Sequence, residues 1–221
     1  MTIPEAYGGQ KLDDISEAIV IEELSRVDPS LGVMVAVHVG LCSMTITLNG
    51  SEEQKNKYLP KLASGEYLGA YSLSEAGSGT DAAAMVARAS EDGDFYTLNG
   101  EKMWVTNGTT ADLFVLFAKV TAHPDYGEKK HGGVTCFIIE KGFEGFKIGK
   151  KEDKLGIRSS DTCTLILDNC KVPKENVLGD VGKGFAIAMN ALDNSRIGIA
   201  AQGLGIAQGA YEAALKYSKE R

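Results

Sequence analysis

The sequence predicts an α+β protein with an N-terminal helical segment, an antiparallel β-barrel-like middle domain and a long C-terminal helix. Three observations predict this class. Apolar residues recur at helical spacing over residues 14–66, short strand-like runs separated by polar, glycine-bearing loops fill residues 69–176, and a proline-free stretch rich in alanine and glycine follows from residue 184. Because the strand-like runs follow one another without intervening helices, they favour an antiparallel sheet or barrel over a doubly wound α/β unit.

The first predicted helix lies in "DDISEAIVIEELSRVD". Its apolar side chains Ile15, Ile19, Ile21 and Leu24 fall within one broad stripe of a helix, which predicts that this stripe faces the core. Asp28 precedes a proline, and helical backbone is disfavoured at such a residue, so the helix is expected to end there.

An uncharged run follows from Pro29 to Ser51. It is long enough to span a bilayer. It also contains His38, Asn49 and several hydroxyl side chains, and its second half has few large apolar residues. We therefore interpret it as a buried helix of a soluble protein rather than as a membrane span. Ser51 is a suitable N-cap for the short amphipathic helix predicted in "EEQKNKYLPKLASGE".

The middle segment carries the strand signals. Asn99-Gly100, between the two apolar-aromatic halves of "FYTLNGEKMWVTNG", predicts a hairpin with a type I′ turn. Further strands are predicted in "ADLFVLFAKV", "GGVTCFIIEK", "GFKIGKK" and "DTCTLILDNCKVP". From Gly184 to Arg221 the pattern predicts one long helix.

Composition restricts the function. The 221 residues carry a formal net charge of −7, which argues against a general binder of nucleic acid or of anionic membranes. None of the four cysteines forms a C-x-x-C pair and the three histidines show no H-x-x-x-H spacing, so we expect buried thiols and no metal site. No signal segment opens the chain, and we expect a cytoplasmic protein.

The stretch "GAYSLSEAGSGTDAAAM" is a candidate ligand loop. It contains Gly77 and Gly79 but neither G-x-G-x-x-G nor a Walker lysine, and it does not connect a strand to a helix in a βαβ unit. A backbone-rich ligand loop and a tight turn between strands therefore stay open as interpretations. Trp104 and Thr106 could serve a flat heteroaromatic ring, or Trp104 could be core and Thr106 solvent-facing.

Four motifs, "AYSLSEAGSGTD", "NGEKMWVTNG", "GKKEDKLGIRSSDTCTLILDNCKVP" and "ALDNSRIGIAAQGLGIAQGA", resemble the acyl-CoA dehydrogenases, most closely the short-chain, butyryl-CoA type from bacteria. The resemblance covers essentially the whole chain, in order and in spacing. It implies that residues 1–67 form a partial N-terminal helical domain, residues 68–177 a β-barrel-like domain for FAD and substrate, and residues 178–221 the first helix of an incomplete C-terminal helical domain. We therefore expect a fragment that is truncated at both ends.

The resemblance also implies site residues. Those that correspond to the FAD-binding segments of the family are Tyr71, Ser72, Leu73, Ser74, Glu75, Ala76, Gly77, Ser78, Gly79, Thr80, Trp104, Val105 and Thr106. Those that correspond to acyl-CoA contacts are Thr80, Asp193, Asn194, Ser195 and Arg196. A fixed guanidinium suits the polyanionic CoA.

The implied reaction is the α,β-dehydrogenation of short-chain acyl-CoA thioesters, in which a carboxylate removes the α proton and the β carbon gives hydride to flavin N5. The family base is a glutamate, located either beyond the position of Arg221 or directly before the CoA-contacting arginine, where this chain has Ser195. We therefore expect no catalytic residue in this chain and little activity from it alone.

Partners follow from the same resemblance: an acyl-CoA substrate, an electron-transfer flavoprotein as acceptor, and a homotetramer in the full-length family. The alternatives are a non-catalytic flavin or acyl-CoA binding remnant, and a relative that uses the scaffold on another substrate, such as an oxidase or a DNA-associated flavoprotein. The negative charge counts against binding to DNA. The sequence does not fix the preferred acyl chain length.

Overall fold

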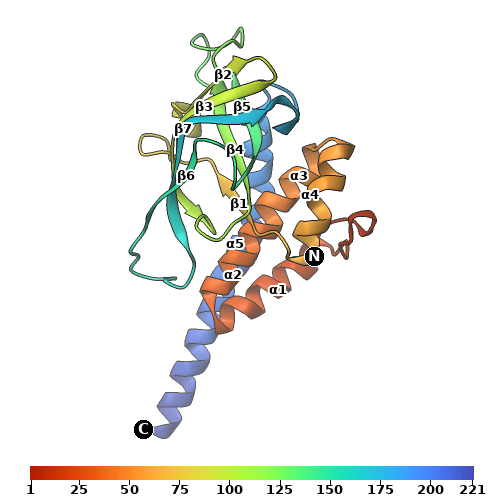
Figure 1. The fold of residues 1–221 in the computed structure, drawn as a ribbon. Coiled ribbons are helices and arrows are strands. Elements are labelled where there is room, and N and C mark those ends of the chain that lie inside the picture. Colours follow the sequence, from red (N-terminus) through yellow and green to blue (C-terminus); the bar gives the residue numbers. More distant parts are fainter.

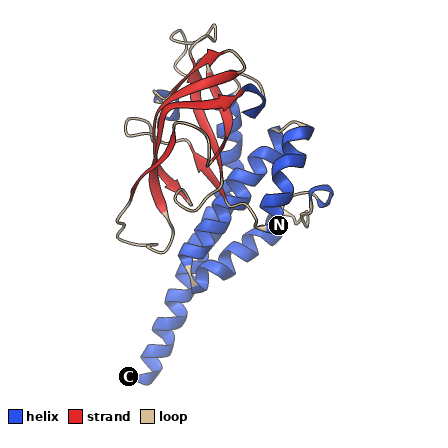
Figure 2. Cartoon of the chain, viewed as in Figure 1, coloured by secondary structure: helices blue, strands red, loops and turns tan.

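Helix α5 (Gly184–Glu220) runs along the whole molecule in this computed structural model, which describes all 221 residues (Figure 1). Its first half packs between the sheet and the N-terminal helices, its next turns stay in contact with α1 as far as Glu212, and only its last turns project away from both. Figure 2 shows the helices gathered on one side of a strongly curved sheet. This arrangement is the α+β architecture that the sequence predicts.

The N-terminal helices begin at polar caps. Helix α1 (Asp14–Val27) begins after Asp13, whose carboxylate accepts a hydrogen bond from the Ser16 N–H at 2.8 Å. Helix α4 (Glu52–Ser64) begins with a capping box in which the Ser51 side chain and the Gln54 side chain each accept from the other's backbone N–H. The predicted N-cap at Ser51 is therefore confirmed.

The uncharged run forms one continuous helical rod made of α2 (Pro29–Ala36), the π-helical turn η2 (Val37–Ser43) and α3 (Met44–Asn49). By length and composition this rod could cross a membrane, but half of its most apolar window is buried inside the protein. Its side chains Val37, Cys42 and Ile46 belong to the core between helices and sheet. The rod thus occupies the position of the predicted core helix.

The sheet contains eight strands: β1 (Gly69–Ser72), β2 (Arg88–Asp92), β3 (Phe95–Thr106), β4 (Leu113–Val120), β5 (Val134–Glu140), β6 (Phe146–Lys151), β7 (Thr162–Pro173) and β8 (Val177–Leu178). Their order is β6-β7-β3-β2-β4-β5-β8, with β1 added on β4. The pairs are antiparallel, as predicted, except that β4 pairs in parallel with both β1 and β2. Short 3₁₀ turns lie at η1 (Glu5–Tyr7), η3 (Ala82–Ala84) and η4 (Lys174–Asn176).

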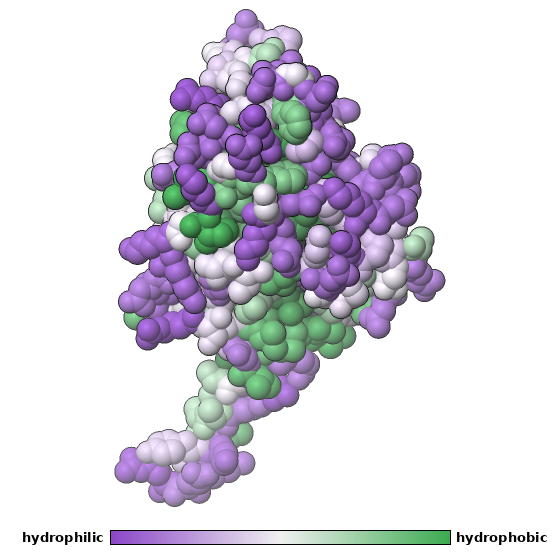
Figure 3. Space-filling model, viewed as in Figure 1, coloured by the Kyte–Doolittle hydropathy of each residue, from purple (hydrophilic) through white to green (hydrophobic).

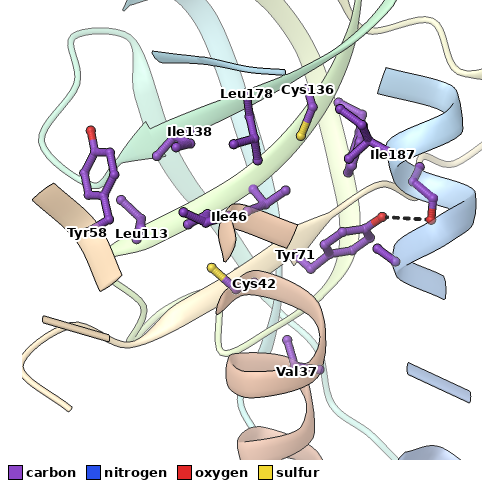
Figure 4. Close-up of a cluster of buried hydrophobic side chains, with 14 of the residues drawn as sticks. Val37, Cys42, Ile46, Tyr58, Tyr71, Leu113, Cys136, Ile138, Leu178 and Ile187 are labelled. Atoms are coloured by element: carbon purple, nitrogen blue, oxygen red, sulfur yellow. Dashed lines mark hydrogen bonds between the residues drawn. The ribbon is translucent and has the colours of Figure 1, made fainter. Parts of the chain in front are cut away.

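Strand β4 separates two hydrophobic cores. Its residues Leu113, Val115 and Phe117 face the helices, whereas the alternate residues Phe114 and Leu116 face the inside of the curved sheet. Figure 4 shows the first core, in which side chains of the helical rod meet those of β4, β5 and α5. Both faces of β4 are covered, which accounts for a strand that is buried and apolar almost throughout.

Two local predictions were wrong. No turn forms at Asn99-Gly100, because both residues lie within β3 and the hairpin turn is instead at Gly93, whose φ is 58°. Gly100 is needed for a long-range reason: a Cβ there would lie 2.8 Å from the Cβ of Ala87. In α1, Ile21 is fully buried as predicted, but Ile15 and Ile19 are 72% and 55% exposed.

Glycines allow α5 to approach α1 closely. A Cβ at Gly205 would lie 2.2 Å from the carbonyl oxygen of Glu22, and a Cβ at Gly209 would lie 2.3 Å from that of Arg26. Along this contact and beyond it, α5 exposes large apolar side chains, namely Leu204, Ile206, Tyr211, Leu215 and Tyr217. Figure 3 shows hydrophobic surface where the helices come together below the sheet.

Candidate functional site

A cleft of about 440 Å³ lies where the end of β1, the far end of β3, the turn η2 and helix α5 meet. Its lining consists of Val37, Leu41, Tyr71, Leu73, Ser74, Gly79, Thr80, Ala82, Met103, Trp104, Thr106, Met189, Leu192 and Arg196. Nine of these fourteen residues are hydrophobic, and the polar groups are few. Apolar walls with a small number of placed polar groups are typical of sites for cofactors and small ligands.

A β-bulge aims Trp104 into the cleft. The pairing of β3 with β7 shifts register between Lys102 and Val105, and Trp104 adopts a positive φ of 61°. As a result Met103 and Trp104 both line the cleft, whereas Val105 is fully buried in the core of the sheet. Trp104 is 58% exposed, so it is not a core residue. A non-glycine residue at positive φ is strained, and such strain clusters at functional sites.

The loop after β1 offers free backbone donors. The Glu75 N–H donates to the Ser78 carbonyl and the Ser78 N–H donates to that of Glu75, which closes the loop into a tight bridge. The backbone N–H groups of Ala76, Gly77, Gly79 and Thr80 find no backbone acceptor in the chain. A Cβ at Gly77 or Gly79 would meet no atom within 4 Å. The chain's own packing therefore does not require these two glycines, and the open space next to them suits the close approach of a ligand.

Tyr71 connects β1 to α5 at the base of the cleft. Its hydroxyl donates to the carbonyl oxygen of Ala188 at 3.4 Å, as Figure 4 shows, and its ring lies 5.2 Å from that of Phe117. Burial raises the pKa of Tyr71 well above its ordinary value, so the side chain stays neutral. Tyr71 is thus a rigid, uncharged wall of the cleft.

Helix α5 contributes the opposite wall through Met189, Leu192 and Arg196, which lie on one helical face. The Arg196 side chain is 78% exposed and its Nε lies 3.4 Å from the Asp193 carboxylate. An exposed pair at this distance is weak, so the guanidinium is available to an anionic ligand. Ser195 Oγ donates to the Leu192 carbonyl at 3.1 Å within the helix.

The structure thus distributes the predicted site residues over different places. Tyr71, Leu73, Ser74, Gly79, Thr80, Trp104, Thr106 and Arg196 line the cleft. The side chains of Ser72, Glu75, Ser78 and Val105 are buried, and those of Asp193 and Ser195, with Ala76 and Gly77, are not part of its lining. Asn194 lines a separate cavity of about 230 Å³ between α1, α3 and α5. The assignment of these residues to FAD and acyl-CoA stays a prediction.

Sequence reasoning missed several wall residues. Val37 and Leu41 come from the uncharged helical rod, and Met189 and Leu192 precede Arg196 on α5. The spacing of Met189, Leu192 and Arg196, at i, i+3 and i+7, could have identified the shared face of that helix. Nothing local indicates Val37 or Leu41, because an apolar residue on a buried helix is normally core.

A second, basic cavity of about 460 Å³ adjoins the segment that follows Thr80. Ala83 to Val86 line it, together with Arg88, Lys119, Tyr126, Lys129 and Lys130. Lys119 Nζ donates to the carbonyl oxygens of Ala83 and Lys130, and Lys130 pairs with Asp81. Since Gly79, Thr80 and Ala82 line the cleft, the segment from Gly79 to Val86 borders both cavities. Lys129 also pairs with Asp125, so Arg88 is the one cation of this cavity that has no side-chain or carbonyl partner. The positive surface beside the Tyr126 ring suits an anionic group such as a phosphate.

The largest cavity, about 580 Å³, lies elsewhere, between α4 and β8. Its polar groups satisfy one another. The Gln54 amide donates to the carbonyl oxygens of Glu175 and Val177, and the Asn176 amide donates to Tyr58 Oη and the Ile138 carbonyl. We therefore interpret this cavity as part of the structural contact between α4 and the sheet.

Comparison with known proteins gives matches over nearly the whole chain. Three family models match in order: "Acyl-CoA dehydrogenase, N-terminal domain" over residues 1–66, "middle domain" over 70–170 and "C-terminal domain" over 182–221. A "short-chain specific" acyl-CoA dehydrogenase of Clostridium acetobutylicum is 50% identical over 223 residues, which include all of this chain and 58% of that protein.

Solved structures agree with these matches. A chain in the solved structure described as "Electron transferring flavoprotein of Acidaminococcus fermentans" is 50% identical to this chain, with a TM-score of 0.95. Butyryl-CoA dehydrogenase from Megasphaera elsdenii is 44% identical, with a TM-score of 0.94. A glutaryl-CoA dehydrogenase from Mycobacterium smegmatis in complex with FADH2 is 32% identical, with a TM-score of 0.89. The first two are covered over 57% of their length and the third over 53%, together with 97–100% of this chain. The chain thus spans little more than half the length of the proteins it matches.

Proposed function

We propose, because this chain belongs to the acyl-CoA dehydrogenase family, that it forms the cofactor- and substrate-binding part of an FAD-dependent enzyme that dehydrogenates short-chain acyl-CoA thioesters at their α and β carbons. One observation carries the proposal. Three segments far apart in the sequence, the loop Leu73–Thr80, the bulge at Trp104 and the α5 face with Arg196, converge on a single cleft.

The donor set of the cleft fits a flavin. The indole of Trp104 and the side chain of Met103 offer a flat apolar surface, Thr106 offers one hydroxyl, and the loop around Gly77 and Gly79 offers N–H groups with no backbone acceptor. We assign these residues to holding FAD. When bound, FAD supplies the hydride acceptor of the reaction.

The substrate assignment rests on shape and charge. The apolar side chains of Val37, Leu41 and Leu192 can accommodate a short acyl chain, and Arg196 provides a cation at the rim of the cleft. The basic cavity at Arg88 and its neighbours lies along the same segment as Thr80. A thioester seated in the cleft could place the phosphates of its CoA in this cavity. The similarity to butyryl-CoA dehydrogenase supports the short-chain preference.

The general base is the missing group. No residue that lines the cleft is an Asp or a Glu, and Ser195 stands where some members of the family carry the base. Removal of the α proton requires a carboxylate within hydrogen-bond reach. We therefore propose that residues 1–221 alone bind without catalysing, and this observation also favours the alternative, a non-catalytic flavin or acyl-CoA binding protein.

Partners follow as proposals from the same similarities. The match to the Acidaminococcus fermentans structure supports an electron-transfer flavoprotein as the acceptor. The apolar side chains that α5 exposes, among them Leu204, Tyr211 and Leu215, support burial of this helix against further helices or a second copy. We propose a homo-oligomer on this basis.

One experiment tests the proposal. The purified chain is mixed with FAD and butyryl-CoA, and the flavin absorbance is followed in a single turnover. We expect binding of both ligands without bleaching of the flavin. Bleaching at the rate of a full-length relative would show that a base is present, and failure to bind either ligand in a folded sample would contradict the assignment of the cleft.

A further inference from the structure

Beneath the cleft lies an ion pair that the proposed chemistry does not use. Lys102 Nζ lies 2.7 Å from Glu75 Oε1, and the two side chains are 0% and 4% exposed. Lys102 is on β3 directly before the bulge, and Glu75 is in the loop after β1. A fully buried ion pair in a sheet domain calls for an explanation, because desolvation of two charges offsets most or all of their attraction.

The pair connects three segments. Glu75 accepts hydrogen bonds from the backbone N–H groups of Val86 at 2.6 Å and Ala87 at 3.1 Å, in addition to the one from Lys102. Lys102 Nζ also donates to the Leu73 carbonyl at 3.1 Å. The N–H of the next residue, Met103, donates to the Ser74 carbonyl at 2.9 Å. The ligand loop, the bulged end of β3 and the chain entering β2 are therefore held together at one charged centre.

The pair also fixes the register of the bulge. Lys102 points inward, so the bulge that follows turns Met103 and Trp104 toward the cleft. A slip by one residue would place Glu101 or Met103 inward instead. Glu101 would set a second carboxylate against Glu75, and Met103 would leave Glu75 without its cation. Either arrangement buries an uncompensated charge, which is strongly unfavourable.

We propose that the Lys102–Glu75 pair is a positioning element that holds the ligand loop and the Trp104 bulge in one arrangement, so that the cleft presents a preformed surface to its flat ligand. The pair does not touch the ligand. The identity of that ligand rests on the proposed function, but the positioning of Trp104 does not. Preformed geometry of this kind reduces the ordering that binding would otherwise require.

Trp104 is the single tryptophan of the chain, so its fluorescence reports the bulge directly. The test variant is Lys102→Met with Glu75→Gln, which removes both charges at nearly constant volume. The matched control is Lys147→Met with Asp168→Asn, because that pair joins β6 and β7 of the same sheet at 2.9 Å but is 60% and 56% exposed. Each protein is examined by thermal unfolding, by Trp104 anisotropy with acrylamide quenching, and by FAD titration.

We expect the buried-pair variant to unfold at a temperature close to that of the wild type, since a buried pair is often replaced by neutral residues without loss of stability. Its Trp104 should nevertheless be looser, with an acrylamide quenching constant raised about twofold. Its dissociation constant for FAD should rise about tenfold, the scale of the cost of ordering a side chain such as Trp104 on binding. The control should match the wild type in all three measurements.

Unchanged anisotropy and quenching of Trp104 in the folded buried-pair variant would overturn the proposal. The proposal would also fail if the unfolding temperature fell far enough to explain the loosening of Trp104 by partial unfolding. The pair would then stabilise the fold without positioning Trp104. If the wild type binds no FAD, the cofactor assignment fails while the Trp104 measurements still decide this inference.

A second variant covers failure of the double variant to fold. Glu75→Asp keeps both charges but shortens the carboxylate side chain by one methylene, so it should loosen Trp104 in the same direction. A folded Glu75→Asp protein with wild-type Trp104 signals would contradict the proposal. Failure of both variants to fold would contradict it too, because it would make the pair a requirement for folding.

Discussion

His38 Nδ1 accepts a hydrogen bond from the backbone N–H of Gly69 at 3.0 Å, which connects the π-helical turn η2 to the first residue of β1. Because an N–H must be the donor there, Nδ1 carries no proton, and the protonated Nε2 donates to the Leu62 carbonyl at 3.1 Å. The neutral ring thus joins η2, the end of α4 and β1. Val37, the neighbour of His38, lines the cleft, so this contact also supports the site.

Acid should weaken this junction. Burial lowers the pKa of His38, against the opposing effect of its bond to the Leu62 carbonyl. The unfolded chain therefore takes up a proton at a higher pH than the folded protein, so stability falls as the pH falls below the ordinary histidine pKa toward the lowered one. Urea unfolding at pH 7.5 and 5.5 measures this. The difference in unfolding free energy between the two pH values should shrink in His38→Gln and persist in the exposed control His131→Gln. Equal differences in the two variants would show that His38 is not the source of the pH dependence.

The contact between α1 and α5 gives a prediction about stability. Gly205→Ala places a Cβ 2.2 Å from the Glu22 carbonyl and should destabilise the protein by about 1–3 kcal/mol through overpacking. Gly203→Ala, on the same helix with nothing within 4 Å, should stabilise it by up to about 1 kcal/mol because alanine favours helix. Denaturant unfolding measures both, and an equal effect of the two substitutions would disprove the close contact.

The ligand loop gives a prediction that separates binding from folding. Gly77→Ala and Gly79→Ala should leave stability within about 0.5 kcal/mol, because nothing in the chain occupies the space of the new methyl group. The same substitutions should weaken FAD binding. The control Gly145→Ala, at φ 80° with its Cβ 2.4 Å from the Asp168 carbonyl, should destabilise by about 1 kcal/mol or more and should leave the cleft unaltered. Unchanged FAD affinity in both loop variants would remove the loop from the site.

Arg196 gives a prediction about ligand discrimination. Arg196→Ala should weaken butyryl-CoA binding about tenfold and FAD binding much less, because the guanidinium stands at the rim of the cleft, paired only weakly with Asp193. Arg158→Ala is the control, since Arg158 is also exposed but does not line the cleft. Calorimetric titration with each ligand makes the comparison. Equal losses for both ligands would mean that Arg196 is structural.

Local signals predicted much of the fold. Ser51 caps its helix, Pro29 opens a new helix, and the proline-free end forms one helix, because each of these effects acts within a few residues of the signal. The prediction of a turn at Gly100 was wrong because the residue that requires a glycine there, Ala87, is distant in sequence. Local turn chemistry was outweighed there by packing between β3 and the chain entering β2.

The candidate site was predicted less completely. Motifs identified the loop and the bulge, but a lysine in a strand ordinarily faces solvent, and nothing near Lys102 reveals that its partner is Glu75, 27 residues away. The apolar wall formed by Val37 and Leu41 is likewise set by the packing of η2 on β1. Both features depend on tertiary contacts that single-sequence patterns do not contain.

The central claim, that the loop, the bulge and α5 build one flavin-binding cleft, is tested most directly by titrating the purified chain with FAD while the fluorescence of Trp104 is recorded. Because Trp104 is the single tryptophan and lines the cleft, a flavin bound there must quench it. If the claim holds, FAD quenches Trp104 saturably, and the quenching weakens in Gly79→Ala. A folded protein whose Trp104 fluorescence shows no saturable change up to about 1 mM FAD, where binding would be worth only about 4 kcal/mol, would contradict it.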